Sequence, residues 1–171
     1  VHAYDDIYAF VKTIPADAAV MLHTGVVNYA ITQNLKKDIR IVDCPNPSQL
    51  MKARKNEIEL ENNRKAHIKD AVAMTKFMYW LKNSIGKETI TEISASDYLE
   101  RLRREQEHNL GLSFSTISAY KEHAAMMHYS ASEETDVELK PEGMLLVDSG
   151  GQYLEGTTDI TRTFVLGPIS D

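Results

Sequence analysis

The sequence predicts an α/β chain that is built from two units. Helical and strand patterns alternate through the first 45 residues, the prolines Pro45 and Pro47 interrupt both patterns, and a long helix followed by several strands occupies the remainder. The first stretch is too short for a complete α/β domain, so we interpret it as the end of one. The linker at 45–48 then divides the chain into residues 1–47 and residues 48–171.

The first unit alternates between helix and strand. Pro15 ends an apolar stripe of helical period, and the next segments carry β-compatible or alternating patterns. His23 and Cys44 fall in or beside strands, where we interpret them as structural side chains. The expected elements are a helix at 4–14, a strand at 18–23, a helix at 26–35 and a strand at 38–44.

The second unit opens with the longest predicted helix. Asn56 and Glu59 fit a capping box at its start, and either Thr91 or Ser94 can cap the helix that follows. The charged residues of the longest helix, including Asp70, are expected on a solvated face. The expected elements are helices at 56–84 and 93–102, strands at 112–118 and 124–129, and a hairpin within 144–166.

Composition excludes several classes of partner. A formal net charge of −6 and a pI of about 5.5 give no basic footprint for nucleic acid, and we expect none to bind. No apolar run approaches the roughly 18 residues that span a bilayer, so we expect no membrane segment. The single cysteine, Cys44, suits a reducing cytoplasmic location, although an exported bacterial protein can share this feature.

The predicted hairpin carries two acids. Its arms, 144–147 and 160–166, are apolar or β-branched, and the turn residues lie at 154–157. Asp148 and Asp159 are eleven residues apart, so an even-numbered loop centred between them would place both on one face, directly opposite each other. A β-bulge would change that parity.

Two like charges that face each other in an apolar ribbon require compensation. Arg162 could pair with either acid, or backbone and threonine donors could surround them near an exposed turn. A shared metal site is the third explanation, because hard divalent cations prefer carboxylate oxygens and a two-metal site uses a bridging carboxylate.

Three segments resemble one family. The hairpin sequence DSGGQYLEGTTDITRT is similar to the metal-binding segment of the Xaa-Pro aminopeptidases, which are pita-bread metallopeptidases related to prolidase and creatinase. The segment MMHYSAS is similar to a substrate-contacting motif of this family, and MKARKNEIELENNRKAHIKD resembles the first long helix of its catalytic domain.

The resemblance implies a role for each matching residue. Asp148 would bind one of two divalent ions, usually manganese, and Asp159 would bridge both. His128 would contact the substrate, a peptide whose second residue is proline and whose N-terminal residue is removed. Residues 1–47 would end a creatinase-like N-terminal α/β domain, residues 48–171 would form the first half of a pita-bread domain, and the parent protein would be a homodimer.

The same resemblance implies that the metal site is incomplete. The family's centre also needs a histidine and two glutamates further along, and no segment here matches their motifs. We therefore expect this chain to be a fragment that is inactive alone. The alternatives are a prolidase-like or creatinase-like hydrolase, or a pita-bread module that has lost catalysis and binds peptides or proteins.

Overall fold

The computed structural model describes residues 1–169 and divides the chain into two compact units, Val1–Lys55 and a second unit that starts at Asn56. The division follows the short helix α3 (Pro47–Ala53), whereas the linker predicted from the sequence precedes most of that helix. No helix in the described range is long and apolar enough to span a bilayer.

The first unit contains the predicted helix and strand alternation. Helix α1 (Asp6–Thr13) precedes strand β1 (Ala19–Leu22), and helix α2 (Tyr29–Asn34) connects β1 to strand β2 (Arg40–Asp43). The two strands pair in parallel. A small apolar cluster holds these elements together, consisting of Val11, Leu35 and Ile39 with Ile14, Val20, Leu22 and Ile31 around them.

Helix α4 (Glu57–Ser84) opens the second unit as the sequence predicts. The Asn56 side chain accepts a hydrogen bond from the Glu59 backbone nitrogen at 2.9 Å, and the Glu59 carboxylate accepts one from the Asn56 nitrogen at 2.8 Å. These reciprocal bonds form a capping box. Thr91 caps helix α5 (Glu92–Arg104) by the same arrangement with Ser94, so Thr91 is the cap.

The strands of the second unit form two small antiparallel sheets. One contains β4 (Ile117–Tyr120), β5 (Met144–Ser149) and β8 (Ile160–Val165) in that order. The other contains β3 (Asn109–Leu112), β6 (Gly151–Tyr153) and β7 (Gly156–Thr157). Because β6 follows β5 and β7 precedes β8, one interrupted hairpin contributes to both sheets.

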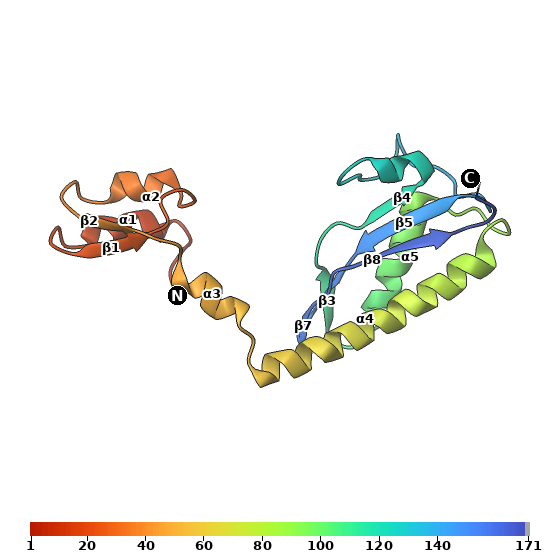
Figure 1. The fold of residues 1–171 in the computed structure, drawn as a ribbon, viewed down its shortest axis with the longest axis horizontal. Coiled ribbons are helices and arrows are strands. Elements are labelled where there is room, and N and C mark those ends of the chain that lie inside the picture. The colour runs from red at the N-terminus through yellow and green to blue at the C-terminus, as the bar shows by residue number, and fades with distance from the viewer. Residues whose placement is uncertain (170–171) are drawn as a thin grey trace. The chain divides into compact units, whose positions relative to one another are not determined.

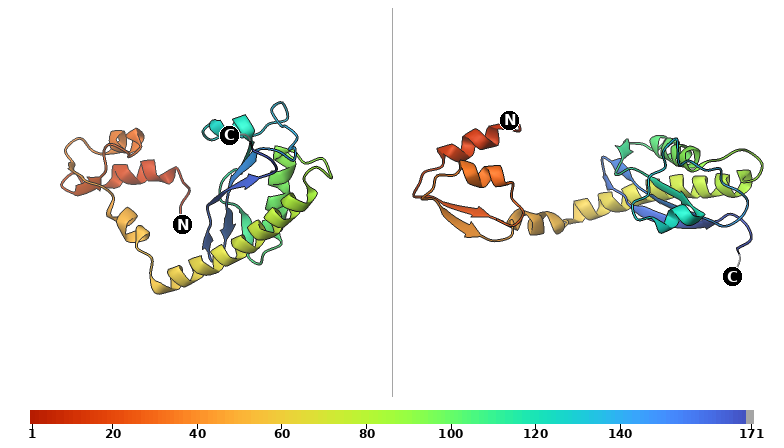
Figure 2. Two further views of the ribbon diagram at one scale, coloured as in Figure 1. Left: turned by 45° about the vertical axis from the view of Figure 1, so that its right-hand side comes forward. Right: turned by 90° about the horizontal axis from the view of Figure 1, so that it is seen from above.

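Helices α4 and α5 lie side by side and cover one face of the β4-β5-β8 sheet (Figures 1 and 2). Leu145 and Val147 of β5 and Phe164 of β8 point into this core, and the Phe164 ring meets Phe77 of α4 edge-on at 5.6 Å between centroids. Alternate residues of the same strands therefore point to the opposite face, which the helices do not cover.

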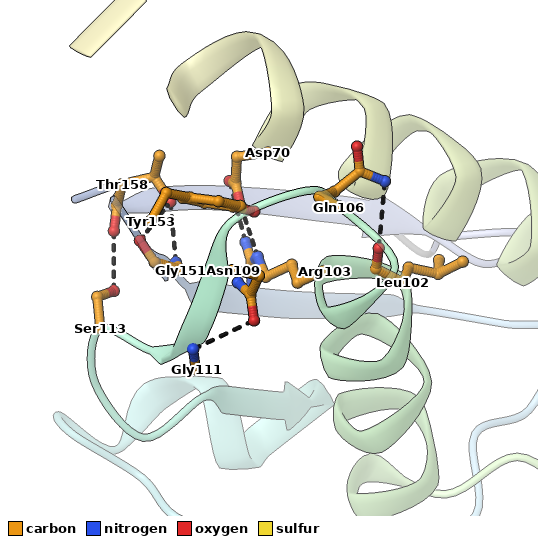
Figure 3. A network of polar contacts seen from close by, with 10 residues as sticks. All are labelled: Asp70, Leu102, Arg103, Gln106, Asn109, Gly111, Ser113, Gly151, Tyr153 and Thr158. Carbon is orange, nitrogen blue, oxygen red and sulfur yellow. Dashed lines mark hydrogen bonds and ion pairs between the residues drawn. The ribbon is translucent and has the colours of Figure 1, made fainter. Parts of the chain in front are cut away.

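Asp70, which the sequence predicts on a solvated face, is buried instead, together with Arg103. Asp70 of α4 is 2% exposed, and Arg103 of α5 is 1% exposed. The Arg103 guanidinium donates to the Asp70 carboxylate from Nε at 2.6 Å and from Nη2 at 3.1 Å (Figure 3). This paired geometry compensates for removing both charges from water.

The same carboxylate connects the helices to the hairpin. The Tyr153 hydroxyl of β6 donates to Asp70 at 3.2 Å (Figure 3). Burial, followed by the Asp70 charge, raises the pKa of Tyr153, so its hydroxyl stays protonated and remains a donor. Asp70 therefore binds α5 and β6 together through two donors that are themselves buried.

We predict that Arg103→Met destabilises the second unit strongly. Removing one partner leaves the Asp70 charge buried with Tyr153 alone, so the free energy of unfolding in urea should fall by about 3–5 kcal/mol. Arg104→Met is the matched control, because Arg104 is 68% exposed in its pair with Glu100 and should change stability by about 0.5 kcal/mol at most. Equal losses in both variants would contradict the importance of the buried pair.

Candidate metal centre

The candidate metal centre lies on the uncovered side of the hairpin. In the register of β5 and β8, Asp148 is opposite Thr161, and beyond the interruption Tyr153 of β6 is opposite Gly156 of β7. The turn is therefore Leu154-Glu155, inside the predicted turn region. Its centre falls one residue beyond the midpoint between the two acids, which shifts the pairing by two residues.

Asp148 and Asp159 are consequently not directly opposite each other, and that part of the prediction is wrong. Asp159 precedes β8 directly, two positions before Thr161. Thr158 is buried, whereas Asp159 and Thr161 are exposed, so the alternation of the strand already operates at Asp159. Both acids belong to the alternation that points away from the helices, and Asp148 is half-buried there.

Of the three compensations considered above for the two acids, the structure shows a threonine donor. The Thr161 hydroxyl donates to Oδ1 of Asp148 at 2.8 Å. The Arg162 guanidinium instead donates to the backbone carbonyl of Thr161 at 2.7 Å, so in the described structure it is engaged with backbone and not with an acid. Asp159 is exposed to solvent, which weakens repulsion between the two carboxylates.

The chemistry of these donors fits hard divalent cations, because carboxylate and hydroxyl oxygens face an open surface. Within residues 1–169, however, no group of three or more His, Cys, Asp or Glu side chains is arranged to hold a metal ion. The described residues thus offer two carboxylates toward such a site, and further ligands would have to come from elsewhere.

A buried threonine fixes the backbone beside Asp159. Thr158 is 1% exposed, and its hydroxyl accepts a hydrogen bond from the Gly151 nitrogen at 2.9 Å (Figure 3). Its carbonyl accepts one from the Ser113 hydroxyl at 2.8 Å. A Cβ on Gly150 would lie 2.0 Å from that carbonyl, so only glycine allows this close approach.

The sequence interpretation missed Ser113 and Thr158 as supports of the candidate ligand. The Gly150-Gly151 pair was the available signal, because consecutive glycines within a strand pattern mark close backbone approach. The partner, Ser113, is 45 residues away from Thr158 in the chain, which no local pattern reveals.

The tip of the hairpin is held by charge. The Glu155 carboxylate accepts from Lys69 Nζ of α4 at 2.6 Å and interacts with Nδ1 of His108 at 2.8 Å. The hydrogen bond from Lys69, followed by that from His108, lowers the pKa of Glu155 from its usual 4.5 to about 2. With only 16% of its side chain exposed, Glu155 is a partly desolvated link between the turn and α4.

His128 lies outside the sheet, so the predicted strand at 124–129 is wrong. Strand β4 ends at Tyr120, and Lys121 adopts a φ of 49°, which turns the chain into the short 3₁₀ helix η1 (Lys121–Ala125). His128 follows in a turn, is exposed, and has a φ of 54°. The apolar residues before it resemble a strand in sequence, but the left-handed residue prevents β4 from continuing.

His123 is the other histidine near this turn. It lies in η1, is half-buried, and its Nδ1 is 2.9 and 3.0 Å from the two carboxylate oxygens of Glu92. His123 is therefore part of a polar cluster beneath the segment that carries His128.

Two family models match this chain, one for each part of it. The model of Metallopeptidase family M24 matches residues 61–171, and that of the Creatinase/Prolidase N-terminal domain matches residues 1–59. The chain belongs to metallopeptidase family M24. These matches confirm the predicted order of a creatinase-like N-terminal segment followed by pita-bread sequence.

The sequence relatives include aminopeptidases from animals and plants. Mouse Xaa-Pro aminopeptidase 2 is 39% identical over 147 residues, which cover 86% of this chain and 22% of that protein. Aminopeptidase P1 of Arabidopsis thaliana is 39% identical over 160 residues, covering 81% of this chain and 25% of that protein. The chain thus spans about a quarter or less of the length of these relatives.

Solved structures share the fold. An X-prolyl aminopeptidase from Caenorhabditis elegans, described as a cytosolic enzyme with a dinuclear active site, has a TM-score of 0.86 and 30% identity, over 99% of this chain and 29% of that one. The X-Pro aminopeptidase of Thermotoga maritima has a TM-score of 0.72 over 100% of this chain and 47% of that one. Its 24% identity supports the fold alone.

We predict that Glu155→Gln weakens the protein in a pH-dependent manner. Because folding lowers the pKa of Glu155, its ionised form stabilises the native state above the unfolded pKa and loses this effect as the pH falls toward about 2. The difference in unfolding free energy between wild type and variant should be largest near neutral pH and shrink between about pH 5 and about pH 2. Urea titrations across this range measure it.

Glu105→Gln is the control for that series. Its carboxylate pairs with Lys76 at 3.6 Å with about half of both side chains exposed, so its effect should be small at every pH. A Glu155→Gln difference that stays constant with pH would contradict the lowered pKa.

Proposed function

We propose that this chain is part of a metal-dependent Xaa-Pro aminopeptidase, which removes the N-terminal residue from peptides that have proline in second position. The single observation that carries the proposal is the placement of Asp148 and Asp159 on the strand alternation that points away from the core, in a chain of the M24 family. The mouse and Arabidopsis aminopeptidases, each 39% identical to this chain, support the substrate class.

In this proposal the two acids hold a pair of divalent ions, for which we propose manganese. Bound ions of this kind supply Lewis-acid activation of water and of the scissile carbonyl. Asp148 contributes an oxygen that Thr161 leaves free, because Thr161 donates to Oδ1 only. Asp159 contributes an exposed carboxylate whose backbone is fixed through Thr158.

His128 contacts the substrate or the tetrahedral intermediate in the same proposal. Its exposed position after η1 leaves the imidazole accessible to a ligand. A neutral imidazole can donate one hydrogen bond to a peptide carbonyl or to the oxyanion that develops from it.

Cellular location and assembly are part of the proposal as well. The cytosolic description of the Caenorhabditis elegans neighbour supports a cytoplasmic location for the complete protein. A homodimeric assembly follows from the family resemblance. The fold itself does not separate the aminopeptidase proposal from prolidase, since Pyrococcus furiosus prolidase has a TM-score of 0.68 at 19% identity.

We predict that Asp159→Asn in the complete protein removes metal and activity while the fold persists. Metal content by mass spectrometry should fall, and kcat on an Xaa-Pro peptide should drop by about a hundredfold or more, equivalent to several kcal/mol of transition-state stabilisation. Because Asp159 is exposed, the unfolding free energy measured on the metal-free proteins should change by about 0.5 kcal/mol or less.

Asp97→Asn provides the matched control, because Asp97 is an exposed carboxylate on α5. It should retain full metal content and turnover. An Asp159→Asn variant that keeps two metal ions and normal kcat would show that Asp159 is not a ligand.

We predict that the purified chain of residues 1–171 does not cleave Xaa-Pro peptides. Two carboxylates leave most of a two-metal coordination shell unfilled, and the described residues contain no further group of ligands. Release of the N-terminal amino acid, measured with added manganese, tests this. Manganese-dependent turnover by the chain alone would overturn it.

A further inference from the structure

A buried carboxylate outside the candidate metal centre collects three donors from one surface segment. Glu92, the first residue of α5, is 0% exposed. Its carboxylate accepts from the Tyr120 backbone nitrogen at 2.6 Å, from the Tyr129 hydroxyl at 2.8 Å, and from His123 Nδ1 at 2.9 Å. A fully buried carboxylate with this many donors is a fixed point in the structure.

The three donors lie along residues 120–129, the segment that carries His128. Tyr120 precedes η1, His123 lies within it, and Tyr129 directly follows His128. The side chains between them are largely exposed, including Met127 at 90%, so little apolar packing holds the segment. Glu92 is therefore the buried side chain that ties this segment to the core, while Lys121 pairs with Glu142 at its exposed start.

This segment also needs an attachment because its backbone is strained. Lys121 and His128 have φ values of 49° and 54°, in the left-handed region that is unfavourable for non-glycine residues. Such conformations persist only where surrounding contacts enforce them. The Glu92 hydrogen bonds lie directly beside both strained positions, at Tyr120 and Tyr129.

The position of Glu92 also explains how a buried acid is tolerated. It occupies the first turn of a 13-residue helix, where the helix dipole favours negative charge. Burial raises the pKa of Tyr129, which keeps its hydroxyl protonated as a donor. The rings of His123 and Tyr129 pack 4.6 Å apart between centroids, so the two donors support each other.

We propose that Glu92 is a positioning residue for His128. It fixes the 3₁₀ turn and the left-handed backbone at 128, and thereby sets the direction in which the imidazole faces a bound peptide. The inference rests on the proposed function only in the role of His128 as a substrate contact. The anchoring itself concerns this chain's own structure.

A double-mutant cycle in the complete protein tests whether Glu92 acts on catalysis through His128. Glu92→Gln removes the charge and replaces one carboxylate oxygen with an amide donor, so the bond on that side persists only if Tyr129 or His123 changes from donor to acceptor. We expect kcat/KM on an Xaa-Pro peptide to fall by about tenfold to a hundredfold with metal content unchanged. The loss in His128→Ala should divide between kcat and KM in the same way as the loss in Glu92→Gln. Adding Glu92→Gln to His128→Ala should then cause no further loss of kcat/KM.

Two outcomes would overturn the proposed effect of Glu92 on catalysis. One is an unchanged kcat/KM in Glu92→Gln, and the other is an equally large loss when the substitution is made beside His128→Ala. Glu100→Gln is the control on the same helix, because Glu100 pairs with Arg104 at the surface and should leave activity unchanged. Tyr129→Phe, which removes a single hydroxyl, gives the milder variant should Glu92→Gln fail to fold.

Hydrogen exchange of the 171-residue chain tests the anchoring separately. Tyr129→Phe and Glu92→Gln should accelerate exchange of the Tyr120 amide and of amides 121–129, while amides in α4 keep their protection. Unchanged exchange in this segment would overturn the anchoring, irrespective of the activity measured for the complete protein. Faster exchange in a complete protein without Xaa-Pro activity would instead retain the anchoring and reject the proposed function.

Discussion

The antiparallel register of β5 and β8 is the constraint on which the second unit depends. It directs Leu145, Val147 and Phe164 into the core and leaves Asp148 and Thr161 on the other face. A slip by one residue would exchange these sets and bury Asp148 without a partner, at a cost of several kcal/mol. The hydrophobic pattern therefore fixes the register, and the register fixes which face presents the acids.

The two parts of the interrupted hairpin are attached to the helices by different forces. Apolar side chains hold β5 and β8 against α4 and α5. Polar links hold the far part: Tyr153 donates to Asp70, and Glu155 pairs with Lys69. Asp159 lies at the junction between these parts, where Thr158 is locked to Gly151 and Ser113. A candidate ligand at a junction held from both sides has a backbone with little freedom, which favours a preorganised site.

Much of the fold could be predicted because its signals are local. The capping box of Asn56 and Glu59, the helix to Ser84 and the two-faced alternation of the hairpin each depend on neighbouring residues. The buried pair of Asp70 and Arg103 could not be predicted, since the partners are 33 residues apart and each alone resembles a surface charge. The strand expected at 124–129 is also absent from the described structure, because Lys121 adopts a left-handed φ that ends β4 and begins η1.

The candidate site shows the same division between local and distant information. Sequence indicated the acids and their common alternation, but the turn centre at Leu154-Glu155 displaced their pairing by two residues. The supports, Ser113 and Thr158 for Asp159 and Glu92 for the segment of His128, emerged only from tertiary contacts. Ligand-type residues thus have a sequence signature, whereas the residues that hold them in place have none of comparable strength.

In the proposed function, Asp148 and Asp159 hold metal together on the open face of the hairpin. An anomalous difference map from crystals of the complete protein grown with manganese tests it most directly. We expect two peaks about 3.5–4 Å apart, with Asp159 within coordinating distance of both and Asp148 of at least one. Peaks remote from these carboxylates, or a well-ordered hairpin with no peak beside it, would show that the two acids do not hold metal together.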